Sequence, residues 1–182
     1  MASIRVEPLA SHHNRAVFQC LDGDLGVYLR ERAKQDVRRR AAAVFVGVFP
    51  SDPNTILGYY TLSSFSLKLQ DIPQKHRRKL ATYPDVGTTL WGRLAVDASF
   101  RSQHVGKFLL VDALRRVAAS EIATVAVIVD SLESAETFYT RYGFMRLSGR
   151  RLWIPIQTVQ QLFPPESVSD AEKEENSAPD PV

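Results

Sequence analysis

The stretch WGRLAVDASFRSQHVGKFLLVDAL, residues 91–114, decides the fold of this 182-residue chain. It begins inside an apolar, β-prone run, Leu90–Val96, which predicts a mostly buried strand. Asp97 and the small residues after it end that run. Apolar residues then recur at helical spacing along one face: Val105, Phe108, Leu109, Ala113 and Leu114. The stretch therefore predicts a strand that passes through a short connection into an amphipathic helix.

The connection, Arg101–Lys107, has the composition of an anion site. The first N–H groups of a helix have no partner within the helix, and the positive end of the helix dipole lies beside them. Gly106 allows the backbone to approach an anion closely, and Arg101 and Lys107 add positive charge. The connection therefore predicts a diphosphate site, although a loop with one glycine is also typical of an ordinary strand-to-helix connection.

The order of residues in this connection resembles the pyrophosphate-binding loop of the GNAT superfamily of N-acetyltransferases, Gln/Arg-x-x-Gly-x-Gly/Ala. Arg101 and Gly106 match its first and last positions. His104 stands at the middle glycine, where the backbone is expected to face a phosphate. This departure leaves two alternatives: the His104 ring donates to the phosphate, or it weakens cofactor binding.

A second segment, Asp130–Phe144, resembles the GNAT helix that ends in Phe-Tyr-x-x-x-Gly-Phe. Three further segments, Leu90–Asp97, Phe18–Asp22 and Leu25–Asp36, are similar to the acetyltransferase toxins of bacterial toxin–antitoxin pairs. The resemblance extends from about residue 5 to about residue 163. It identifies the chain as a member of the GNAT superfamily and favours the toxin branch.

The resemblance implies an α/β GNAT fold: a mixed, mostly antiparallel central sheet flanked by helices and splayed between Leu94–Val96 and Val125–Val129. It implies acetyl-CoA as the cofactor and the α-amine of aminoacyl-tRNA as the acceptor, so that the protein blocks translation. It also implies a homodimer and a ribbon-helix-helix antitoxin, through which the pair binds operator DNA. The choice of tRNA does not follow from any motif.

The resemblance places the cofactor along the end of one strand and the start of two helices. The cofactor-binding residues that it implies are Leu94, Ala95, Val96, Arg101, Ser102, Gln103, His104, Val105, Gly106, Lys107 and Phe138. Backbone groups near Leu94 are expected to pair with the pantetheine arm, and an N–H there to stabilise the oxyanion. Tyr139 is expected beside the cofactor sulfur as the general acid, since a tyrosine pKa of about 10 keeps it protonated at neutral pH. The alternative for Tyr139 is a packed ring with its hydroxyl in solvent.

The acceptor side offers positively charged candidates and no evident general base. The ester of an aminoacyl-tRNA should make its amine more acidic than that of lysine, so positioning alone favours attack near neutral pH. Arg93 is a candidate for contact with the acceptor's phosphate or ribose, and equally for a structural ion pair. A basic run between Pro73 and Pro84 adds the substrate-binding candidates Lys75, Arg77 and Arg78. In the GNAT fold this loop is expected near the acceptor opening; the alternative is a solvated loop.

Composition indicates one soluble globular domain, expected at residues 1–163, with 45% hydrophobic and 24% charged residues overall. Residues 164–182 carry six carboxylates against one lysine and few bulky apolar side chains, so a disordered acidic tail is expected there. Because the whole chain has net charge +3 and this tail −5, the remainder carries +8. Such a body favours an anionic partner, nucleic acid above all, or is simply a solubilising surface.

Several further features bear on compartment and metal content. No signal peptide is recognisable and no apolar run is long enough to span a bilayer, so we expect the cytoplasm and no membrane. Cys20 is the single cysteine, which excludes an intrachain disulfide, and no metal site is predicted. His12 and His13 are expected on the surface.

The apolar pattern also predicts the outer elements. Strands are expected at residues 3–9, 43–49, 56–66, 122–129, 144–147 and 151–156, and helices at 24–39 and 131–142. The resemblance to the toxin family implies a further short helix at residues 157–163. The second and third of these strands should form an antiparallel hairpin around Pro50–Asn54. The run 122–129 suits a strand buried on both faces, and Pro155 predicts a strand at the sheet edge. The segment Asp22–Asp24 is expected to supply a turn and the N-cap of the first helix. That helix presents Arg30, Lys34 and Arg38 on its outer face, as an RNA contact or as a solvated face.

Two other functions remain open. A GNAT enzyme of this kind could instead acetylate a small amine or a protein N-terminus. RNA binding with a steep salt dependence would distinguish the tRNA acceptor from these two. A catalytically inactive fold could serve as corepressor with a DNA-binding antitoxin. His104 favours that alternative, whereas Tyr139 and Gly106 oppose it.

Overall fold

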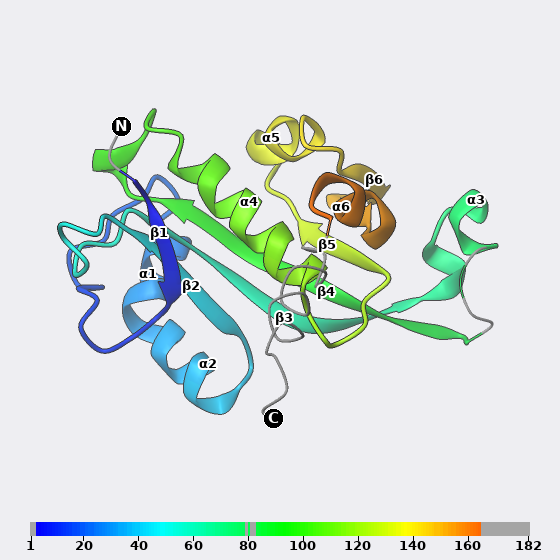
Figure 1. Ribbon diagram of the computed structural model, residues 1–182, viewed down its shortest axis with the longest axis horizontal. Coiled ribbons are helices and arrows are strands. Elements are labelled where there is room, and N and C mark those ends of the chain that lie inside the picture. Colours follow the sequence, from blue (N-terminus) through cyan, green and yellow to red (C-terminus); the bar gives the residue numbers. More distant parts are fainter. Residues whose placement is uncertain (1–2, 79, 81–82, 165–182) are drawn as a thin grey trace, which may run out of the picture.

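The computed structural model describes residues 3–78, 80 and 83–164. One seven-stranded sheet with the order β1-β2-β3-β4-β5-β7-β6 forms its centre (Figure 1). All neighbouring strands are antiparallel except β4 and β5, so the expected mixed, mostly antiparallel sheet is confirmed. The strands are β1 Arg5–Pro8, β2 Ala43–Val48, β3 Gly58–Lys68, β4 Asp85–Val96, β5 Ala126–Asp130, β6 Met145–Ser148 and β7 Arg151–Pro155.

Helices cover both faces of the sheet (Figure 1). One face carries α1 Gly23–Val27, the π-helical turn η1 Tyr28–Arg32 and α2 Ala33–Arg39. The other face carries α4 Val105–Ala118, α5 Glu136–Thr140 and α6 Ile156–Leu162. The short elements that remain are η2 Leu69–Asp71, α3 Gln74–Arg77, η3 Ala98–Phe100 and η4 Glu133–Ala135. Helix α4 connects β4 to its parallel neighbour β5, because a parallel pair needs a crossover connection.

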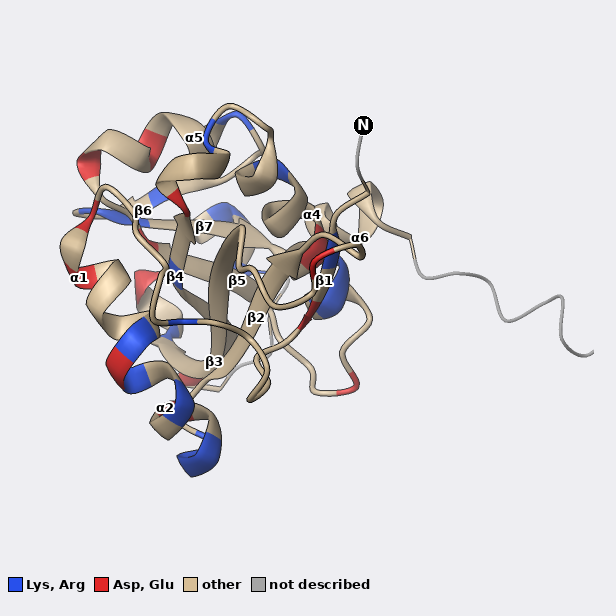
Figure 2. Ribbon diagram, turned by 90° about the vertical axis from the view of Figure 1, so that its left-hand side faces the viewer, with Lys and Arg blue, Asp and Glu red and all other residues tan. Residues whose placement is uncertain are grey.

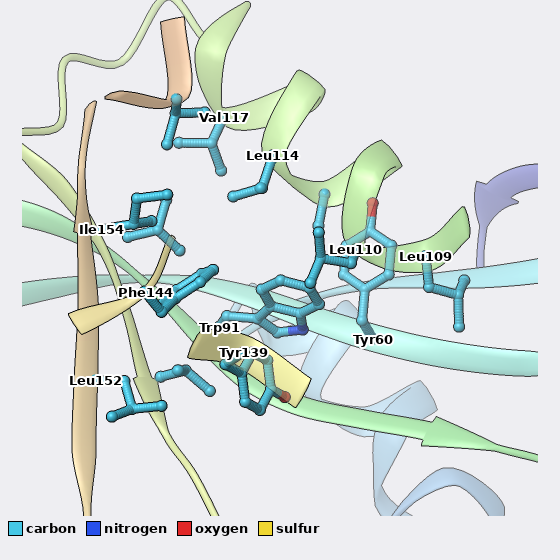
Figure 3. Packing of buried hydrophobic residues seen from close by; sticks show 14 of the residues in the cluster. Tyr60, Trp91, Leu109, Leu110, Leu114, Val117, Tyr139, Phe144, Leu152 and Ile154 are labelled. Atoms are coloured by element: carbon cyan, nitrogen blue, oxygen red, sulfur yellow. The ribbon is translucent and has the colours of Figure 1, made fainter. Parts of the chain in front are cut away.

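The core beneath α4 is built around the indole of Trp91, which is fully buried (Figure 3). The rings of Tyr60, Tyr139 and Phe144 meet it at centroid distances of 5.9, 5.7 and 6.3 Å. Its Nε1–H donates to the carbonyl of Arg93 at 3.0 Å, so the polar atom of this large side chain is satisfied. This packing fixes Tyr139 relative to the last residues of β4.

Most local expectations are confirmed. Asp22 caps the first helix, since its carboxylate accepts from the N–H groups of Asp24 and Leu25. Helical structure then continues to Arg39, through the π-helical turn. The expected hairpin of β2 and β3 and the short C-terminal helix are also present.

Three expectations were wrong: the start of β5, the position of β7 in the sheet and the burial of Phe108. Ile122 is 76% exposed and β5 begins only at Ala126, because the residues before Val125 do not reach a neighbouring strand. Pro155 does not mark an edge: β7 lies between β5 and β6, and the proline is its last residue, where the ladder ends. Phe108 faces outward and is 47% exposed, while Val105 and the remaining apolar residues of α4 are buried.

Most of the expected acidic tail, residues 165–182, lies outside the described residues. Among the helices that the structure describes, none combines the length and the apolarity that crossing a bilayer requires.

Candidate active site

A β-bulge lies in β4 beside Trp91. In the pairing of β3 with β4, Thr61 lies opposite Arg93 and Leu62 lies opposite Trp91, so Gly92 has no residue opposite it. An extra residue of this kind bends its strand and increases the local twist. The bulge therefore redirects the last residues of β4.

Beyond the bulge, β4 parts from β5. The parallel pairing of the two strands covers only Thr89–Trp91 against Val127–Val129. Leu94–Val96 still pair with β3, but on their other side they border a cleft of about 740 Å³. The expected splay of the two central strands is confirmed, and it leaves backbone N–H and C=O groups available to an extended ligand.

The cleft gathers nearly all the predicted cofactor residues. Its walls come from the end of β4, the start of α4, the region around α5 and the start of α1. Gln103 is the one predicted cofactor residue that does not border it. The predicted residues that do border it are Leu94, Ala95, Val96, Arg101, Ser102, His104, Val105, Gly106, Lys107, Phe138 and Tyr139.

The connection before α4 exposes the first helical N–H groups to this cleft. His104 caps the helix in a left-handed conformation, with φ of 60°, and Ser102 has φ of 68°. The first helical hydrogen bond runs from Phe108 N to His104 O at 3.1 Å. Among the described residues, no acceptor is found for the N–H groups of residues 105–107, which leaves these donors available to an anion. His104 thus supplies the left-handed turn that a glycine would make more easily.

Gly106 leaves space that the protein itself does not use. A Cβ built there would meet Val96 Cγ2 at 3.7 Å and Phe138 Cζ at 3.8 Å, which are ordinary van der Waals contacts. Protein packing therefore does not require glycine at this position. That a ligand closely approaches the helix start at Gly106 stays a prediction.

Tyr139 lies in the wall of the cleft with its ring buried. Its side chain comes from α5, is 5% exposed and packs edge-to-face against Trp91 and Phe144. Burial raises the pKa of Tyr139 above its ordinary value, so the hydroxyl is protonated at neutral pH. No hydrogen bond found among the described residues uses this hydroxyl, which leaves it available to a ligand as a donor. Phe138, half-buried, adds an apolar wall beside it, with the two ring centroids 5.2 Å apart.

The opposite wall was not predicted from the sequence. It consists of Cys20, Leu21, Asp22 and Leu25, at the entry to α1. Asp22 could be recognised in the sequence as a helix cap, but its place facing the cleft depends on tertiary packing. The other lining residues that the sequence did not reveal are Phe100, Leu132, Ser134, Ala135 and Tyr142. Tyr142 is half-buried.

Asp97 joins this wall to the end of β4. Its two carboxylate oxygens accept from Gln19 N at 2.8 Å and from Ser99 N at 2.9 Å, and Ala98 N donates to Gln19 O at 2.7 Å. The side chain is 7% exposed. The loop before α1 is thereby held in fixed relation to Leu94–Val96.

Replacing Asp97 by Ala should lower the thermal midpoint by several degrees. The change leaves two backbone donors without acceptors, at about 1–3 kcal/mol for a buried group. Each kcal/mol corresponds to roughly 2–4 °C in a domain of this size. Differential scanning calorimetry measures the shift, and an unchanged midpoint would show that the contact does not hold the wall.

Arg93 lies on the α1–α2 side of β4 and does not border the cleft. Its guanidinium stacks on the ring of Tyr28 at 3.7 Å, and the Tyr28 hydroxyl donates to Asp36 at 2.9 Å. Burial and the Asp36 carboxylate raise the pKa of Tyr28 to about 12. Arg93 thus has a structural role, as one alternative expected, but through a cation–π contact rather than an ion pair. Its contact with an acceptor stays a prediction.

The basic candidates Lys75, Arg77 and Arg78 are not brought to the cleft. Helix α3 lies at the opposite end of the longest axis from the start of α4 (Figure 1). The reason is the length of the ribbon formed by β3 and β4, which remain paired as far as Lys68 and Asp85. Arg77 Nε donates to the carbonyl of Ile72 at 3.3 Å. The expectation that this segment lies near the acceptor opening is not met within one chain.

His13 is not on the surface as expected, because its partner lies on β1. The residue is 3% exposed, its Nδ1 accepts from Ala10 N at 2.9 Å, and its Nε2 lies 3.0 Å from Glu7 Oε1. Potential ligand atoms of Glu7, His12 and His13 lie within 4.8 Å of one another. Since Nδ1 accepts, Nε2 carries the proton and donates to Glu7, so it is not free to bind a metal. These hydrogen bonds therefore connect the loop that carries His13 to Glu7 on β1.

Sequence comparison identifies the relatives of this chain. The family model described as "Acetyltransferase (GNAT) domain" matches residues 89–152. The tRNA-acetylating toxin of Mycobacterium tuberculosis is 33% identical over 131 residues, which cover 70% of this chain and 75% of that protein. Probable toxin TacT of Sinorhizobium fredii is 26% identical over 171 residues, 87% of this chain and 94% of that protein.

Structural comparison gives the same result. AtaT complexed with acetyl-methionyl-tRNAfMet has a TM-score of 0.80 and 25% identity, over 88% of this chain and 99% of that chain. AtaTR has also been solved bound with AcCoA, at a TM-score of 0.78 and 26% identity over 90% of this chain and 99% of that chain. A mutant of AtaT bound to the C-terminus of the antitoxin AtaR has a TM-score of 0.75 at 23% identity, over 89% of this chain and 99% of that chain.

The splayed sheet, the matching family model and the mycobacterial relative define a GNAT acetyltransferase. Within that superfamily the chain belongs to the family of the tRNA-acetylating toxins, since its identity to the mycobacterial toxin extends over three quarters of that protein.

Proposed function

We propose that this enzyme transfers the acetyl group of acetyl-CoA to the α-amine of an aminoacyl-tRNA and thereby blocks translation. The observation that carries the proposal is the parting of β4 from β5 beneath the start of α4, with Tyr139 in the wall of the resulting cleft. The relatives that act on tRNA support the choice of acceptor. An acetylated α-amine is no longer a nucleophile, which explains the block.

The residues present fit the cofactor. The open N–H groups of residues 105–107 and the cations Arg101 and Lys107 suit a diphosphate, and the space at Gly106 admits it. Leu94–Val96 offer backbone groups to the amides of a pantetheine arm. Acetyl-CoA, when bound, supplies an acetyl thioester.

Two groups of this chain would then promote the transfer. An N–H near Leu94 stabilises the oxyanion as the amine attacks the thioester carbon. As the C–N bond forms and the C–S bond breaks, the Tyr139 hydroxyl gives its proton to the departing thiolate and recovers one from solvent. The burial that raises the pKa of Tyr139 keeps this proton available across the physiological range.

The outer face of α2 suits RNA phosphates. Its basic residues are exposed, and Figure 2 shows them as blue segments of α2 at the lower left of the view. Arg30, expected on the same face, instead folds back and donates to the Phe18 carbonyl at 2.7 Å. The exposed cations of α2 are Lys34, Arg38 and Arg39, and the exposed Arg32 at the end of η1 precedes them.

Replacing Arg38 and Arg39 together by Glu should weaken binding of aminoacyl-tRNA and reduce its salt dependence. Each lost phosphate contact lowers the slope of log K against log salt by about one. Fluorescence anisotropy over a salt series measures both quantities. The matched variant changes Lys75 and Arg78 to Glu, in and beside α3 at the other end of the molecule. We expect it to lower the tRNA affinity and the salt dependence less. Equal loss in both variants, or none in the first, would contradict the assignment of this surface.

Assembly and compartment belong to the same proposal. We propose a homodimer that acts in the cytoplasm, where charged tRNA is found. A ribbon-helix-helix antitoxin would neutralise it and carry the pair to operator DNA. The complex of AtaT with the C-terminus of AtaR supports an antitoxin of some kind.

A further inference from the structure

The cleft has one acidic residue among its lining side chains. Two cations, Arg101 and Lys107, lie on the wall formed by the start of α4. Asp22 lies on the other wall, at the entry to α1. In the view of Figure 2, α1 lies to the left of β4 and α5 lies above it. The site is therefore polarised: an anion is favoured at one wall and a cation at the other.

Asp22 is held in place by its neighbours. Its Oδ1 accepts from Asp24 N at 3.0 Å and from Leu25 N at 3.3 Å, and its carbonyl accepts from Cys20 Sγ at 2.9 Å. The loop that carries it is fixed to the end of β4 by the contacts of Asp97 with Gln19. Among the described residues no hydrogen bond uses Asp22 Oδ2, so this oxygen is available to a ligand. A half-buried carboxylate in a fixed position is suited to orient a reacting group.

The acceptor limits what such a carboxylate can bind. The end of a tRNA carries phosphates, which Asp22 repels, and sugar hydroxyls. With an amino acid attached whose side chain carries no nitrogen, the one cationic or proton-donating nitrogen outside the bases is the α-amino group. We propose that Asp22 recognises the α-amino group of the acceptor and takes its proton as the amide forms. This inference rests on the proposed function and supplies the general base that the sequence did not reveal.

The proton balance is complete with this residue. The amine nitrogen attacks the thioester carbon, and the new C–N bond places a positive charge on nitrogen. Asp22 accepts a proton from this nitrogen, which removes the positive charge. Tyr139 protonates the sulfur as the C–S bond breaks. Both groups then exchange protons with solvent, so no other reactant is needed.

Helix capping alone does not require a negative charge at this position. Asparagine and serine cap helices about as well as aspartate, and the cap uses Oδ1 only. Asp22→Asn therefore keeps the fold and the cap while it removes the proton acceptor. Asp24→Asn is the matched control. It removes the same charge from a residue two positions further along the chain, whose side chain is exposed and does not line the cleft.

The test compares binding and turnover in the wild type and both variants. Without acetyl-CoA, anisotropy with aminoacylated and uncharged forms of the same tRNA measures recognition of the amine. We expect the wild type and Asp24→Asn to bind the aminoacylated form several-fold more tightly, and Asp22→Asn to bind both forms equally. Turnover of Asp22→Asn should fall about a hundredfold or more, as for loss of a general base.

If Asp22→Asn keeps either the discrimination or the turnover of Asp24→Asn, the proposal is overturned. Failure of the proposed function is a separate result, because then the wild type itself would acetylate no aminoacyl-tRNA.

Discussion

Replacing Tyr139 by Phe should lower the turnover of acetyl transfer about a hundredfold to ten-thousandfold, the range for loss of a general acid. The ring keeps its packing against Trp91 and Phe144, so fold and thermal midpoint should change little. Acetyl-CoA affinity should also persist, because the anion site lies at the start of α4. Steady-state kinetics and titration calorimetry separate the two quantities.

The comparison variant is Tyr142→Phe, which removes the other phenol that borders the cleft. We expect it to retain turnover near that of the wild type. In cells, induced wild-type protein should arrest growth, and Tyr139→Phe should not when both accumulate equally. Equal toxicity of the Tyr139 variant would mean that water or another group protonates the thiolate.

Replacing Gly106 by Val should weaken acetyl-CoA binding about tenfold to a hundredfold. The side chain would enter the space beside Val96 and Phe138 and displace the diphosphate from the helix start. Hydrogen bonds to a charged group contribute about 1.5–3 kcal/mol, and each 1.4 kcal/mol is a factor of ten. Titration calorimetry with acetyl-CoA measures the change.

Gly106→Ala is the graded control, since its Cβ has ordinary contacts with both neighbours. Its effect should lie between those of glycine and valine. Neither variant should destabilise the free protein, because both residues favour helix more than glycine does. Unchanged affinity in Gly106→Val, or no heat with the wild type, would show that the diphosphate does not bind here.

The sequence predicted the central elements well because their signals are local. The apolar run that ends at Val96 and the helical spacing after Val105 depend only on neighbouring residues, and both elements are present. The left-handed conformation at His104 was not foreseen as such. The sequence marked this position only as a missing glycine.

The misplaced features depend on partners that are distant in sequence or space. The run from Ile122 has strong β preference, yet a strand forms only where neighbours supply hydrogen bonds. His13 looked exposed because Glu7 meets it only when β1 and the following loop fold together. Pro155 is the last residue of β7, which pairs with β5 on one side and β6 on the other. Its missing N–H therefore does not indicate a strand at the edge of the sheet.

The candidate site was predictable on one wall only. Residues of β4, α4 and α5 belong to motifs of fixed spacing and could be assigned together. Asp22 and its neighbours reach the cleft through the contact of Asp97 with Gln19, which joins residues far apart in the chain. No pattern along the sequence encodes that contact.

The central claim, acetylation of the α-amine of aminoacyl-tRNA, has a direct chemical readout. Purified protein is incubated with acetyl-CoA and a pool of aminoacylated tRNAs. The amino acids are then released from the ester and analysed by mass spectrometry, beside a reaction with Tyr139→Phe. We predict N-acetylated amino acids with the wild type and almost none with the variant. Unmodified amino acids in both reactions, from wild-type protein that binds acetyl-CoA and acetylates a small amine or a peptide N-terminus, would contradict the claim.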